Sequence, residues 1–530
     1  MPRNNATNIT RYFSKEAESS LRAYFGRVVK GQPEVYDTPF ARGESTEALL
    51  NAWDKVLVSI SDKWPTLYEF EKDLASKVGP LSVMAPLKDR MTDIDHYYED
   101  IRLSSAPLSR SAVAAVKREW SVANGLRIRN EDKTVQSMKL STNSGSPYFT
   151  KRNRVIHETI PSRILISGNE VTQHLPNYHG RGCAVIGWRG QEGGPSKEDV
   201  KQRVVWMFPF AVNVQELRVY QPLIEAAQKF NLVPAWVSME AVDQRVTRMF
   251  DTKSNDDLVV CTDFSKFDQH FNHSLQDVAR ELIATLFKGG ISKEWLAEIY
   301  PIKYMIPIMY NWGQIRTGLH GMASGSGGTN ADETLAHRTL QYEAAIRAGA
   351  WLNPNSQCLG DDGMLTYPGI TVEDVVETYR MHGLEMNDSK QYSSTQDCVY
   401  LRRWHHKNYR MANICVGVYS TMRALGRLRY LERYYDPEIW GPKMVALRQL
   451  SIIENVKWHP LRDQFAEFCM KRDKYRLGID IPGFLDNIAD EARKAIDYMP
   501  DFLGYTKTLQ SDGNDIGIAN WWIIQYLKSK

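Results

Sequence analysis

Two aspartates that follow short apolar runs constrain the fold of this chain more than any other feature. Residues 258–261 are apolar, and Asp263 comes two residues later, as in a buried strand that delivers a carboxylate at its end. The tetrapeptide Gly-Asp-Asp-Gly at 360–363 lies between two further apolar runs and has the composition of a tight hairpin. Because neighbouring strands lie about 4.8 Å apart, one sheet can bring Asp263 and Asp361 to the same end.

Converging carboxylates repel one another and need a cation nearby. Two Mg²⁺ ions about 3.5–4 Å apart neutralise such a set and are the usual device for in-line phosphoryl displacement. The alternative is structural, because an aspartate after a strand or in a hairpin often only caps a turn. The two aspartates alone leave both interpretations open.

Composition places the chain among folded, multidomain proteins. Its 530 residues are 43% hydrophobic and 24% charged, which excludes a largely disordered chain and predicts roughly three or four domains. The six cysteines form no CxxC pair, and this favours a reducing compartment. His270 and His273 have no third ligand nearby in the sequence, so zinc is not implied. No apolar run reaches membrane-spanning length, and we expect no membrane segment.

Helical periodicity surrounds the two carboxylate motifs. One helix is predicted from about 275 to 286, with Asn272 or Ser274 as N-cap, and another from about 329 to 349. Residues 106–250 are rich in Gly, Pro and Ser and predict loops that face a ligand. Other segments with helical spacing are 47–64, 443–455, 461–473 and 484–498.

Three blocks in a fixed order connect the carboxylates to a known family. They are Asp263-Phe-Ser-Lys-Phe-Asp268, Ser324-Gly-Ser-Gly-Gly-Thr329-Asn330 and Gly360-Asp361-Asp362. This order resembles motifs A, B and C of viral RNA-dependent RNA polymerases. The amino-acid sequences of the three blocks are most similar to those of the polymerases of picobirnaviruses, which are double-stranded RNA viruses. The resemblance spans about residues 140–430.

The resemblance implies an α+β right-hand fold, in which fingers, palm and thumb encircle the active site. The palm would contain an antiparallel sheet with helices, and the thumb would be helical. The implied domains are an N-terminal extension that bridges fingers and thumb at 1–105, fingers at 106–250, palm at 251–271, a fingers insertion at 272–317, palm again at 318–404, and thumb with a C-terminal tail at 405–530.

The resemblance also assigns the catalytic chemistry. Asp263 and Asp361 would bind both metal ions, Mg²⁺ with Mn²⁺ as a substitute, and Asp362 would be a lesser ligand or tuner. Asp268 would face the ribose, where a carboxylate can accept a hydrogen bond from the 2′-hydroxyl. Lys390, in a block similar to motif D, would be the general acid that protonates the departing pyrophosphate. A surface lysine after a turn is the alternative interpretation of Lys390.

Further residues are assigned to the nucleotide. In motif B the candidates are Ser324, Thr329 and Asn330, and either Asn330 or Glu333 completes the ribose-sensing network. Residues 197–206 resemble motif F, whose basic side chains meet the triphosphate. The candidates there are Lys197, Lys201 and Arg203. Arg203 is the strongest of them, because a guanidinium can pair bidentately with phosphate.

The RNA path is assigned to two blocks and to segments rich in basic residues. The candidates for template and product contacts are Ser144, Gly145 and Pro147, in a block similar to motif G, and Arg402 and Arg403, in a block similar to motif E. Residues 101–210 hold 17 Lys and Arg against 8 Asp and Glu, although the whole chain carries only +3. Residues 401–430 hold 7 against none. Such segments favour a channel that follows a phosphate backbone, with Trp188, Trp206 and Trp404 as candidates for base stacking. Solvated helix faces are the alternative.

The function implied is an RNA-directed RNA polymerase that replicates and transcribes a double-stranded RNA genome in the virion interior and the host cytoplasm. Its partners would be template and product RNA, ribonucleoside triphosphates and a capsid protein, and we expect a monomer. A reverse transcriptase or another palm-type nucleotidyltransferase would share the aspartates, but a reverse transcriptase carries a bulky aromatic where this chain has Asp268. A non-catalytic RNA-binding structural protein would share only the basic segments. Residues 512–524 could form a tail that gates product exit, or could simply close a core.

Overall fold

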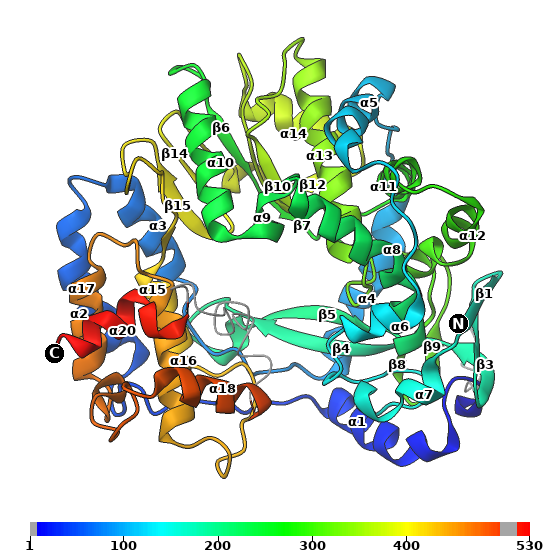
Figure 1. Ribbon diagram of the computed structural model, residues 1–530, viewed down its shortest axis with the longest axis horizontal. Helices are drawn as coiled ribbons and strands as arrows, with labels where there is room; N and C mark the ends of the chain where they lie inside the picture. The colour runs from blue at the N-terminus through cyan, green and yellow to red at the C-terminus, as the bar shows by residue number, and fades with distance from the viewer. Residues whose placement is uncertain (1–7, 499–516) are drawn as a thin grey trace.

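The computed structural model describes residues 8–498 and 517–530, and Figure 1 shows the described elements arranged around a central opening. The helices are α1 Glu18–Lys30, α2 Thr46–Leu57, α3 Pro65–Ala75, α4 Met91–Glu99, α5 Arg110–Glu119, α6 Glu131–Gln136, α7 Ile156–Thr159, α8 Phe210–Lys229, α9 Pro234–Val237, α10 Met239–Thr252, α11 His273–Leu286, α12 Gly290–Glu298, α13 Thr329–Arg347, α14 Val372–Met381, α15 Thr421–Arg429, α16 Pro442–Glu454, α17 Arg462–Lys471, α18 Ile488–Tyr498 and α20 Trp522–Lys528. The strands are β1 Arg163–Ser167, β2 Glu170–Leu175, β3 Tyr178–Gly182, β4 Ala184–Gln191, β5 Lys201–Met207, β6 Val259–Thr262, β7 Phe264–Ser265, β8 Ile308–Asn311, β9 Gln314–Arg316, β10 Gln357–Leu359, β11 Asp362–Leu365, β12 Glu385–Met386, β13 Tyr392–Ser394, β14 Asp397–Tyr400, β15 Arg403–His406 and β16 Val418–Tyr419.

The predicted carboxylate-bearing strand and hairpin form one antiparallel sheet of order β10-β11-β6-β13. Strand β6 lies between β11 and β13, and all four of its residues are buried. Thr262 at the end of β6 pairs with Gly363 of β11. Asp263 and the 360–363 turn therefore lie at the same end of the sheet, as the sequence predicts.

Helices cover both faces of this sheet because successive residues of β6 point to opposite sides. Val259 and Cys261 pack with α10 residues in one apolar cluster, whereas Val260 joins a larger cluster that includes α13. Helices α11 and α13 form where sequence periodicity predicts them, and Asn272 caps α11 by accepting from the Ser274 and Leu275 amides. The site is thus built on a sheet held between helices.

A second sheet, of order β5-β4-β8-β9, carries a long hairpin. Strands β4 and β5 are antiparallel over seven residue pairs, from Val185 with Met207 to Gln191 with Lys201. Figure 1 shows this hairpin extending across the centre of the molecule toward α15 and α16.

The N-terminal segment joins two separate apolar cores. Tyr12, Phe13, Leu21 and Phe25 pack into the larger core, which contains β4, β5 and α13 residues. Residues 40–74 instead contribute to the core formed by α15, α16, α17 and α20. The helix predicted over 47–64 is shorter than expected, because α2 ends at Leu57 and a 3-10 turn, Val58–Ile60, follows. Pro65 then begins α3 at its first position, which suits a residue without an amide hydrogen.

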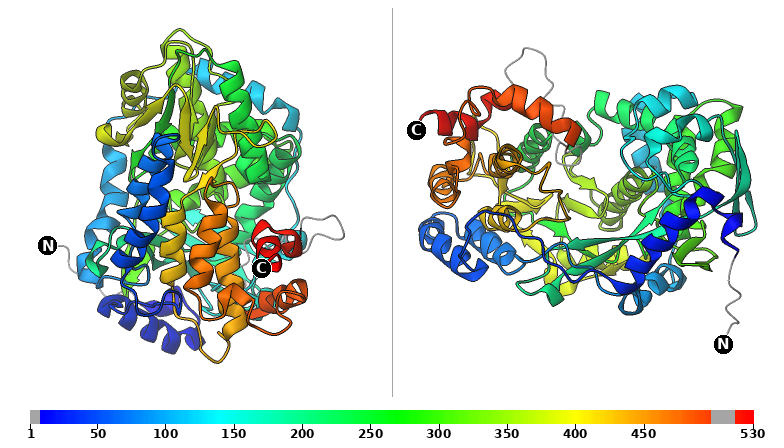
Figure 2. Two further views of the ribbon diagram at one scale, coloured as in Figure 1. Left: turned by 90° about the vertical axis from the view of Figure 1, so that its left-hand side faces the viewer. Right: turned by 90° about the horizontal axis from the view of Figure 1, so that it is seen from below.

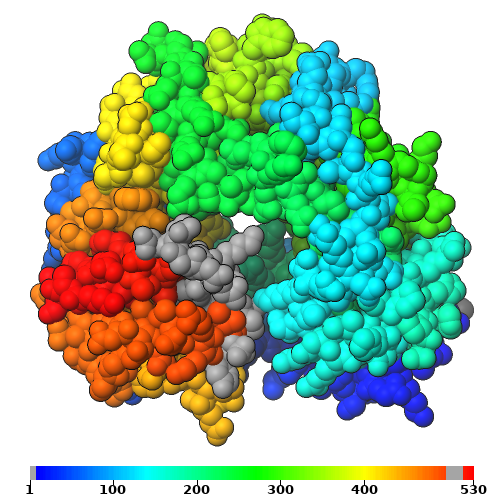
Figure 3. Space-filling model, viewed as in Figure 1, coloured from blue at the N-terminus to red at the C-terminus, as the bar shows by residue number. Residues whose placement is uncertain are grey.

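The two cores are also joined across the opening. Glu192, beyond the end of β4, lies between Arg423 and Arg427 of α15, with nitrogen to oxygen distances of 3.5 and 2.9 Å. Arg189 of β4 lies 3.9 Å from Glu432, which follows α15. The view from below shows the N-terminal segment, in blue, running from one side of the molecule to the other (Figure 2), and the space-filling view shows a face hollowed at its centre (Figure 3).

Several helices near the C-terminus agree with the sequence. Helices α16, α17 and α18 occupy the segments predicted near 443–455, 461–473 and 484–498. Residues 512–516 of the proposed gating tail lie outside the described residues, whereas Ile523, Ile524 and Leu527 of α20 are buried in the core with α16 and α17. Within the described ranges, every helix is too short or too polar to span a bilayer.

Candidate active site

Asp263 and Asp361 lie next to each other at the end of the β10-β11-β6-β13 sheet. Asn387 donates to Asp263 Oδ2 through its side-chain nitrogen at 2.8 Å, which orients the carboxylate. Gln391 holds the backbone on both sides, because it accepts from the Asp263 amide at 3.0 Å and donates to the Asp263 carbonyl at 2.7 Å. Asp361 sits at the tip of the β10–β11 turn, where the residue is accessible to solvent although the protein surrounds much of its carboxyl group.

Helix α13 fixes the turn that carries Asp361. Gly360 has a φ of 57°, in the left-handed region that favours glycine. Its amide donates to Thr334 Oγ1 at 2.9 Å, and its carbonyl accepts from His337 Nδ1 at 2.8 Å. Burial lowers the pKa of His337 to about 4, so the imidazole is neutral and serves as a fixed donor.

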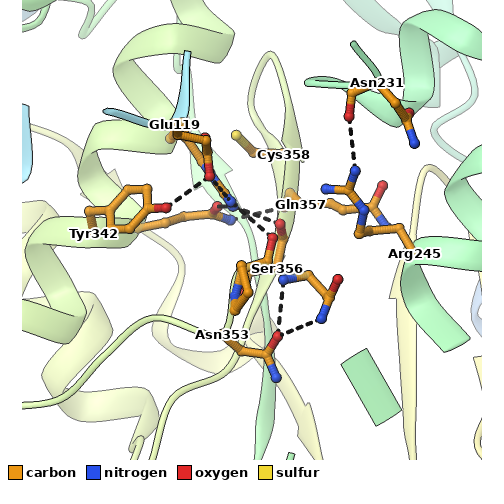
Figure 4. A network of polar contacts seen from close by, with 12 residues as sticks. Glu119, Asn231, Arg245, Tyr342, Asn353, Ser356, Gln357 and Cys358 are labelled. Carbon is orange, nitrogen blue, oxygen red and sulfur yellow. Dashed lines mark hydrogen bonds and ion pairs between the residues drawn. The ribbon is translucent and has the colours of Figure 1, made fainter. Parts of the chain in front are cut away.

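A polar network behind the site locks α13 against the strand that leads into this turn (Figure 4). Arg338 of α13 pairs with Glu119 of α5 at 2.6 Å and donates to the Ser356 carbonyl at 2.6 Å. Tyr342 donates to the same glutamate at 2.8 Å, and Gln341 donates to the Gln357 carbonyl at 2.9 Å. Direct hydrogen bonds therefore tie the turn and the strand that leads into it to α13.

The Asp362 carboxylate joins the site to a neighbouring turn. Its Oδ2 accepts from the Leu401 amide at 2.9 Å, in the β14–β15 turn. Burial and the charge of Asp361 raise the pKa of Asp362 to about 7. With this carboxyl group engaged by the turn, the tuning role predicted from sequence fits its contacts better than a ligand role.

The charges around Asp361 suit a bound cation. Burial and the charges of Asp268 and Asp263 raise the pKa of Asp361, against the lowering effect of Arg203. In the described part of the chain, no group of three or more acidic, His or Cys side chains is arranged as metal ligands. Two carboxylates, Asp263 and Asp361, are therefore the donors available to a cation. Such a pair fits Mg²⁺, which protein sites commonly bind through one or two carboxylates together with waters and substrate phosphates. His270 does not contribute, because its Nδ1 faces the Lys266 carbonyl at 2.8 Å.

Arg203 and Asp268 face each other at the side of the site. Arg203 comes from β5, and its guanidinium lies 3.4 Å from Asp268 Oδ2. The Arg203 side chain is 51% exposed, whereas that of Asp268 is 8% exposed. Arg203 can therefore still reach a ligand in the channel while its partner stays enclosed.

Basic side chains gather beside Asp263. Burial and the positive charges of Lys77, Lys390 and Arg402 lower the pKa of Lys201, and Asp263 opposes this shift. Lys390 and Arg402 are exposed, as is Lys197 in the β4–β5 turn. Three of the predicted basic residues, Lys197, Lys201 and Arg203, lie on the β4–β5 hairpin, and Lys390 and Arg402 lie near Lys201. Lys77 was not predicted, because nothing in its surrounding sequence marks it.

The predicted motif B hydroxyls shape their own loop. Ser324 Oγ donates to the Val204 carbonyl at 3.2 Å, and Thr329 Oγ1 donates to the carbonyls of Ala323 and Ser326 at 3.3 and 3.2 Å. A Cβ on Gly325 would lie 1.5 Å from the Trp206 carbonyl oxygen, so only glycine allows this approach.

The two candidates for ribose sensing, Asn330 and Glu333, lie in different surroundings in the structure. Asn330 accepts from the Trp236 indole nitrogen at 2.8 Å. Glu333 is 5% exposed, and burial together with the charge of Asp268 raises its pKa well above the usual value. The sequence left this choice open. Sequence analysis missed Thr334 and His337, which follow Asn330 at the i+4 and i+7 spacing of one helix face, and this spacing is the signal that could have indicated them.

Several residues predicted to contact RNA are buried or bonded to other residues of the protein. Ser144, Gly145 and Pro147 are buried, and Gly145 at φ 62° packs against the Phe208 carbonyl. Arg403 pairs with both oxygens of Asp243 at 2.8 and 3.0 Å, and its side chain is 11% exposed. These contacts build the loops that border the channel, and they leave only Arg402 of the product pair exposed.

The expectation that three tryptophans stack bases is wrong. Trp188, Trp206 and Trp404 are at most 9% exposed. Trp188 lies under the Arg90 guanidinium at 3.7 Å, and Trp206 packs against His320 with ring centres 4.3 Å apart and ring planes tilted by 35°. Trp404 packs edge-on against Trp64. These tryptophans lie in the core although their segments are basic, because burying a large aromatic surface lowers the free energy of the fold more than exposing it would.

Comparisons with known proteins extend the motifs to the whole chain. A family model described as viral RNA-dependent RNA polymerase matches residues 111–464. A protein of human picobirnavirus (strain Human/Thailand/Hy005102/-), described as a potential RNA-dependent RNA polymerase, is 62% identical over 530 residues, which is 99% of each chain. The crystal structure of the RNA-dependent RNA polymerase of a human picobirnavirus superposes with a TM-score of 0.94 at 62% identity, covering 98% of each chain. An insertion loop deletion mutant of such a polymerase superposes with a TM-score of 0.92 at 60% identity, covering 98% of each chain.

A more distant structure shares the fold alone. The Sicinivirus 3Dpol RNA-dependent RNA polymerase covers 70% of this chain and 82% of its own length with a TM-score of 0.50 at 14% identity. The family and the two 62% matches exclude a reverse transcriptase and a non-catalytic structural protein. The predicted resemblance, the α+β right-hand fold and the RNA-directed RNA polymerase activity are confirmed, and the chain belongs to the viral RNA-dependent RNA polymerases.

Proposed function

We propose that RNA synthesis takes place between Asp263, Asp361 and the Arg203–Asp268 pair. The observation that carries this proposal is the convergence of two aspartates, from β6 and the β10–β11 turn, at one end of a single sheet. The basic residues of β5 lie opposite this end, which supports an incoming triphosphate between them.

The domain boundaries read from sequence form part of the proposal. Residues 251–271 and 318–404 would be the palm, 106–250 and 272–317 the fingers, and 405–530 the thumb and tail. Residues 1–105 would be the extension that joins fingers to thumb. The packing of residues 12–28 in one core and 40–74 in the other supports this last assignment.

Asp263 and Asp361 would hold two Mg²⁺ ions, or Mn²⁺ in their place. When bound, the ions supply positive charge that stabilises the attacking 3′-oxygen and the leaving phosphate oxygen. The raised pKa of Asp361 among neighbouring carboxylates is the feature of this chain that fits such ions. Asp362 would tune the site through its bond to the Leu401 amide.

The remaining residues of the site would position the nucleotide. Arg203 and Lys201 would bind the triphosphate, and Asp268 would accept a hydrogen bond from the ribose 2′-hydroxyl. Lys390, exposed beside this group, would give a proton to the departing pyrophosphate. Lys197 at the hairpin tip would draw triphosphates toward the channel.

The polymerase would use ribonucleoside triphosphates and a template RNA, and Arg402 would contact the product strand. Because the relatives are viral, we propose that the chain replicates and transcribes a double-stranded RNA genome as a monomer associated with a capsid protein. It would work in the virion interior and in the host cytoplasm.

The substitution Asp361→Asn tests the site. We expect RNA synthesis with Mg²⁺ on a single-stranded template to fall by about a thousandfold, because several kcal/mol of charge stabilisation is lost. RNA binding and the melting temperature should stay near those of the wild type. The control is Asp62→Asn, which changes an exposed carboxylate far along the chain from the site and should leave synthesis unchanged. Full activity of folded Asp361→Asn would contradict the proposal.

A further inference from the structure

Glu216 of α8 is a fully buried carboxylate that contacts the Gly-rich loop, residues 324–328, which leads into α13. Its Oε1 accepts from the Gly327 amide at 3.1 Å, and its Oε2 accepts from the Ser326 hydroxyl. Asn213, one turn earlier on α8, donates to Oε1 at 2.9 Å when its amide is turned to satisfy both of its neighbours. The carboxylate thus joins a helix to two donors of the loop.

The Gly-rich loop is attached at both ends as well as at its middle. Ser324 Oγ donates to the Val204 carbonyl of β5 at 3.2 Å. Thr329, the first residue of α13, donates to the Ser326 carbonyl at 3.2 Å. Between these two attachments, Glu216 holds the middle of the loop against α8. The loop therefore lies between β5 and α13 at a position that α8 fixes.

The glycines of the loop pack closely on α8. A Cβ on Gly328 would lie 2.3 Å from the Tyr220 ring, and one on Gly327 would lie 3.0 Å from the Leu217 side chain. Glycine allows this approach, but it has no side chain of its own with which to anchor the loop. The hydrogen bonds to Glu216 supply that anchor.

The charged and titratable groups that face Glu216 come from three elements. Burial is the largest influence and raises the pKa of Glu216 to about 7, against the lowering effect of Lys303, which follows α12. Asp332 of α13 raises it further. Lys303 and Asp332 pair with each other at 3.0 Å, and Tyr220 of α8 donates to Asp332 at 2.6 Å. Glu216 is therefore ionised above about pH 7 and protonated below it.

We propose that Glu216 is a positioning residue for RNA synthesis, whose ionised carboxylate holds the Gly-rich loop and so sets the spacing between β5 and α13. Strand β5 carries Arg203, and α13 fixes the turn that carries Asp361. Protonation converts one acceptor oxygen of Glu216 mainly into a donor, which weakens its hold on the two loop donors. The inference rests on the site proposed above, in which Arg203 and Asp361 act on the same nucleotide.

The substitution Glu216→Gln tests this role, because Gln keeps the shape of the side chain and resembles the protonated acid at every pH. The measurement is single-nucleotide incorporation by the full chain on a primed RNA template, with saturating ATP and Mg²⁺, from pH 6 to pH 8. The rate of the wild type divided by that of the variant removes pH effects common to both. We expect this ratio to be about ten at pH 8 and to approach one at pH 6.

The matched control is Glu225→Gln. Glu225 lies on the same helix, is exposed and pairs with Arg129, so the ratio for this variant should stay near one at every pH. A ratio for Glu216→Gln that is near one at pH 8, or that does not change with pH, would overturn the inference.

Thermal melting separates positioning from simple loss of structure. The folded-state pKa of Glu216 lies above the unfolded value of about 4.3, so the ionised carboxylate costs stability as pH rises from about 4.3 to about 7. The melting temperature of Glu216→Gln relative to the wild type should therefore rise between pH 6 and pH 8, while its relative rate falls. A relative rate that falls together with the relative melting temperature would indicate a purely structural role and would also contradict the inference.

Ser326→Ala tests whether Glu216 acts through the loop. This change removes one loop donor and leaves α8 intact, so the double variant with Glu216→Gln should be little slower than the slower single variant. Effects that multiply in the double variant would show that Glu216 acts elsewhere.

Asp361→Asn distinguishes failure of this inference from failure of the proposed function. If Asp361→Asn stops synthesis while Glu216→Gln matches the wild type at pH 8, only the role of Glu216 is wrong. If folded Asp361→Asn is fully active, the proposed site is wrong, and the inference falls with it.

Discussion

At the scale of single residues, the geometry of the site depends on side chains that touch no substrate. Thr334 and His337 bind the two polar backbone groups of Gly360, and Asn387 orients Asp263. Glycine is needed at 360 because the turn requires a left-handed backbone. Asp263 and the turn that carries Asp361 are therefore held by neutral partners, which leave the negative charge of the two carboxylates uncancelled.

The substitution Thr334→Val tests this support. Val has the shape of Thr but no hydroxyl, so the buried Gly360 amide would lose its acceptor at a cost of about 1–3 kcal/mol. We expect a lower melting temperature and slower nucleotide incorporation. Thr339→Val is the matched control, because the Thr339 hydroxyl is also buried on α13 but bonds only to the Leu335 carbonyl of its own helix. Equal loss of incorporation in both variants would show that the Gly360 contact has no special role.

At the scale of elements, α3 of the N-terminal segment is joined to the start of α15 through one carboxylate. Buried Glu71 of α3 accepts from the Thr421 and Met422 amides at 3.1 and 3.3 Å and from the hydroxyls of Ser420 and Thr421. His459 lies 3.2 Å away. The first amides of a helix lack intrahelical acceptors, and a carboxylate there is favoured by the helix dipole. The two elements are far apart in sequence, and this contact fixes how they pack.

Glu71 predicts a measurable pH dependence of stability. Burial alone would raise the pKa of Glu71, but His459 and the two hydroxyls lower it below its usual value. A lowered pKa stabilises the fold above the unfolded-state pKa of about 4.3, and this contribution is lost as pH falls through the lower folded-state pKa. We expect the melting temperature of the wild type to exceed that of Glu71→Gln at pH 7, with a difference that shrinks toward pH 4.

Glu69→Gln is the control for that measurement. Glu69 lies on the same helix but is exposed, so its replacement should change the melting temperature little at either pH. A difference between wild type and Glu71→Gln that is constant from pH 7 to pH 4 would contradict the expected role of the charge.

Comparison of sequence with structure separates local signals from long-range ones. Strand β6, the 360–363 turn and α11 were predictable, because hydrophobic runs, turn residues and caps act over a few positions. The contacts of Arg403 with Asp243 and of Trp206 with His320 were not predictable, because the partners are far apart in the sequence. The choice between Asn330 and Glu333 was not predictable either, because it depends on contacts with residues of other segments, such as the contact of Asn330 with Trp236.

At the scale of the whole molecule, the β4–β5 hairpin and α15 complete an enclosure around the site. Glu192, with an 8% exposed side chain, is held by Arg423 and Arg427. Figures 1 and 3 show the opening bordered by the hairpin and by the helices on either side. Basic residues of the hairpin lie near the carboxylates Asp263, Asp268 and Asp361, so the small net charge of the whole chain conceals a strong local contrast.

The substitution Glu192→Ala tests the closure. The two arginines would lose their shared carboxylate, and we expect the hairpin to separate from α15 more readily. RNA products should become shorter, and the shortening should increase with salt as phosphate contacts weaken. Glu198→Ala is the matched control, because Glu198 is exposed in the same turn. Products of wild-type length from Glu192→Ala at every salt concentration would show that this contact does not keep the enclosure closed.

The enclosure has a topological consequence. A strand inside a closed ring can arrive there only by threading a free end, whereas an open groove could receive it sideways at any point. An unbroken circle of RNA has no end to thread and stays outside as long as the ring is shut. We therefore expect a linear RNA to be accepted as template and an unbroken circle of the same sequence to be rejected for as long as the ring stays shut.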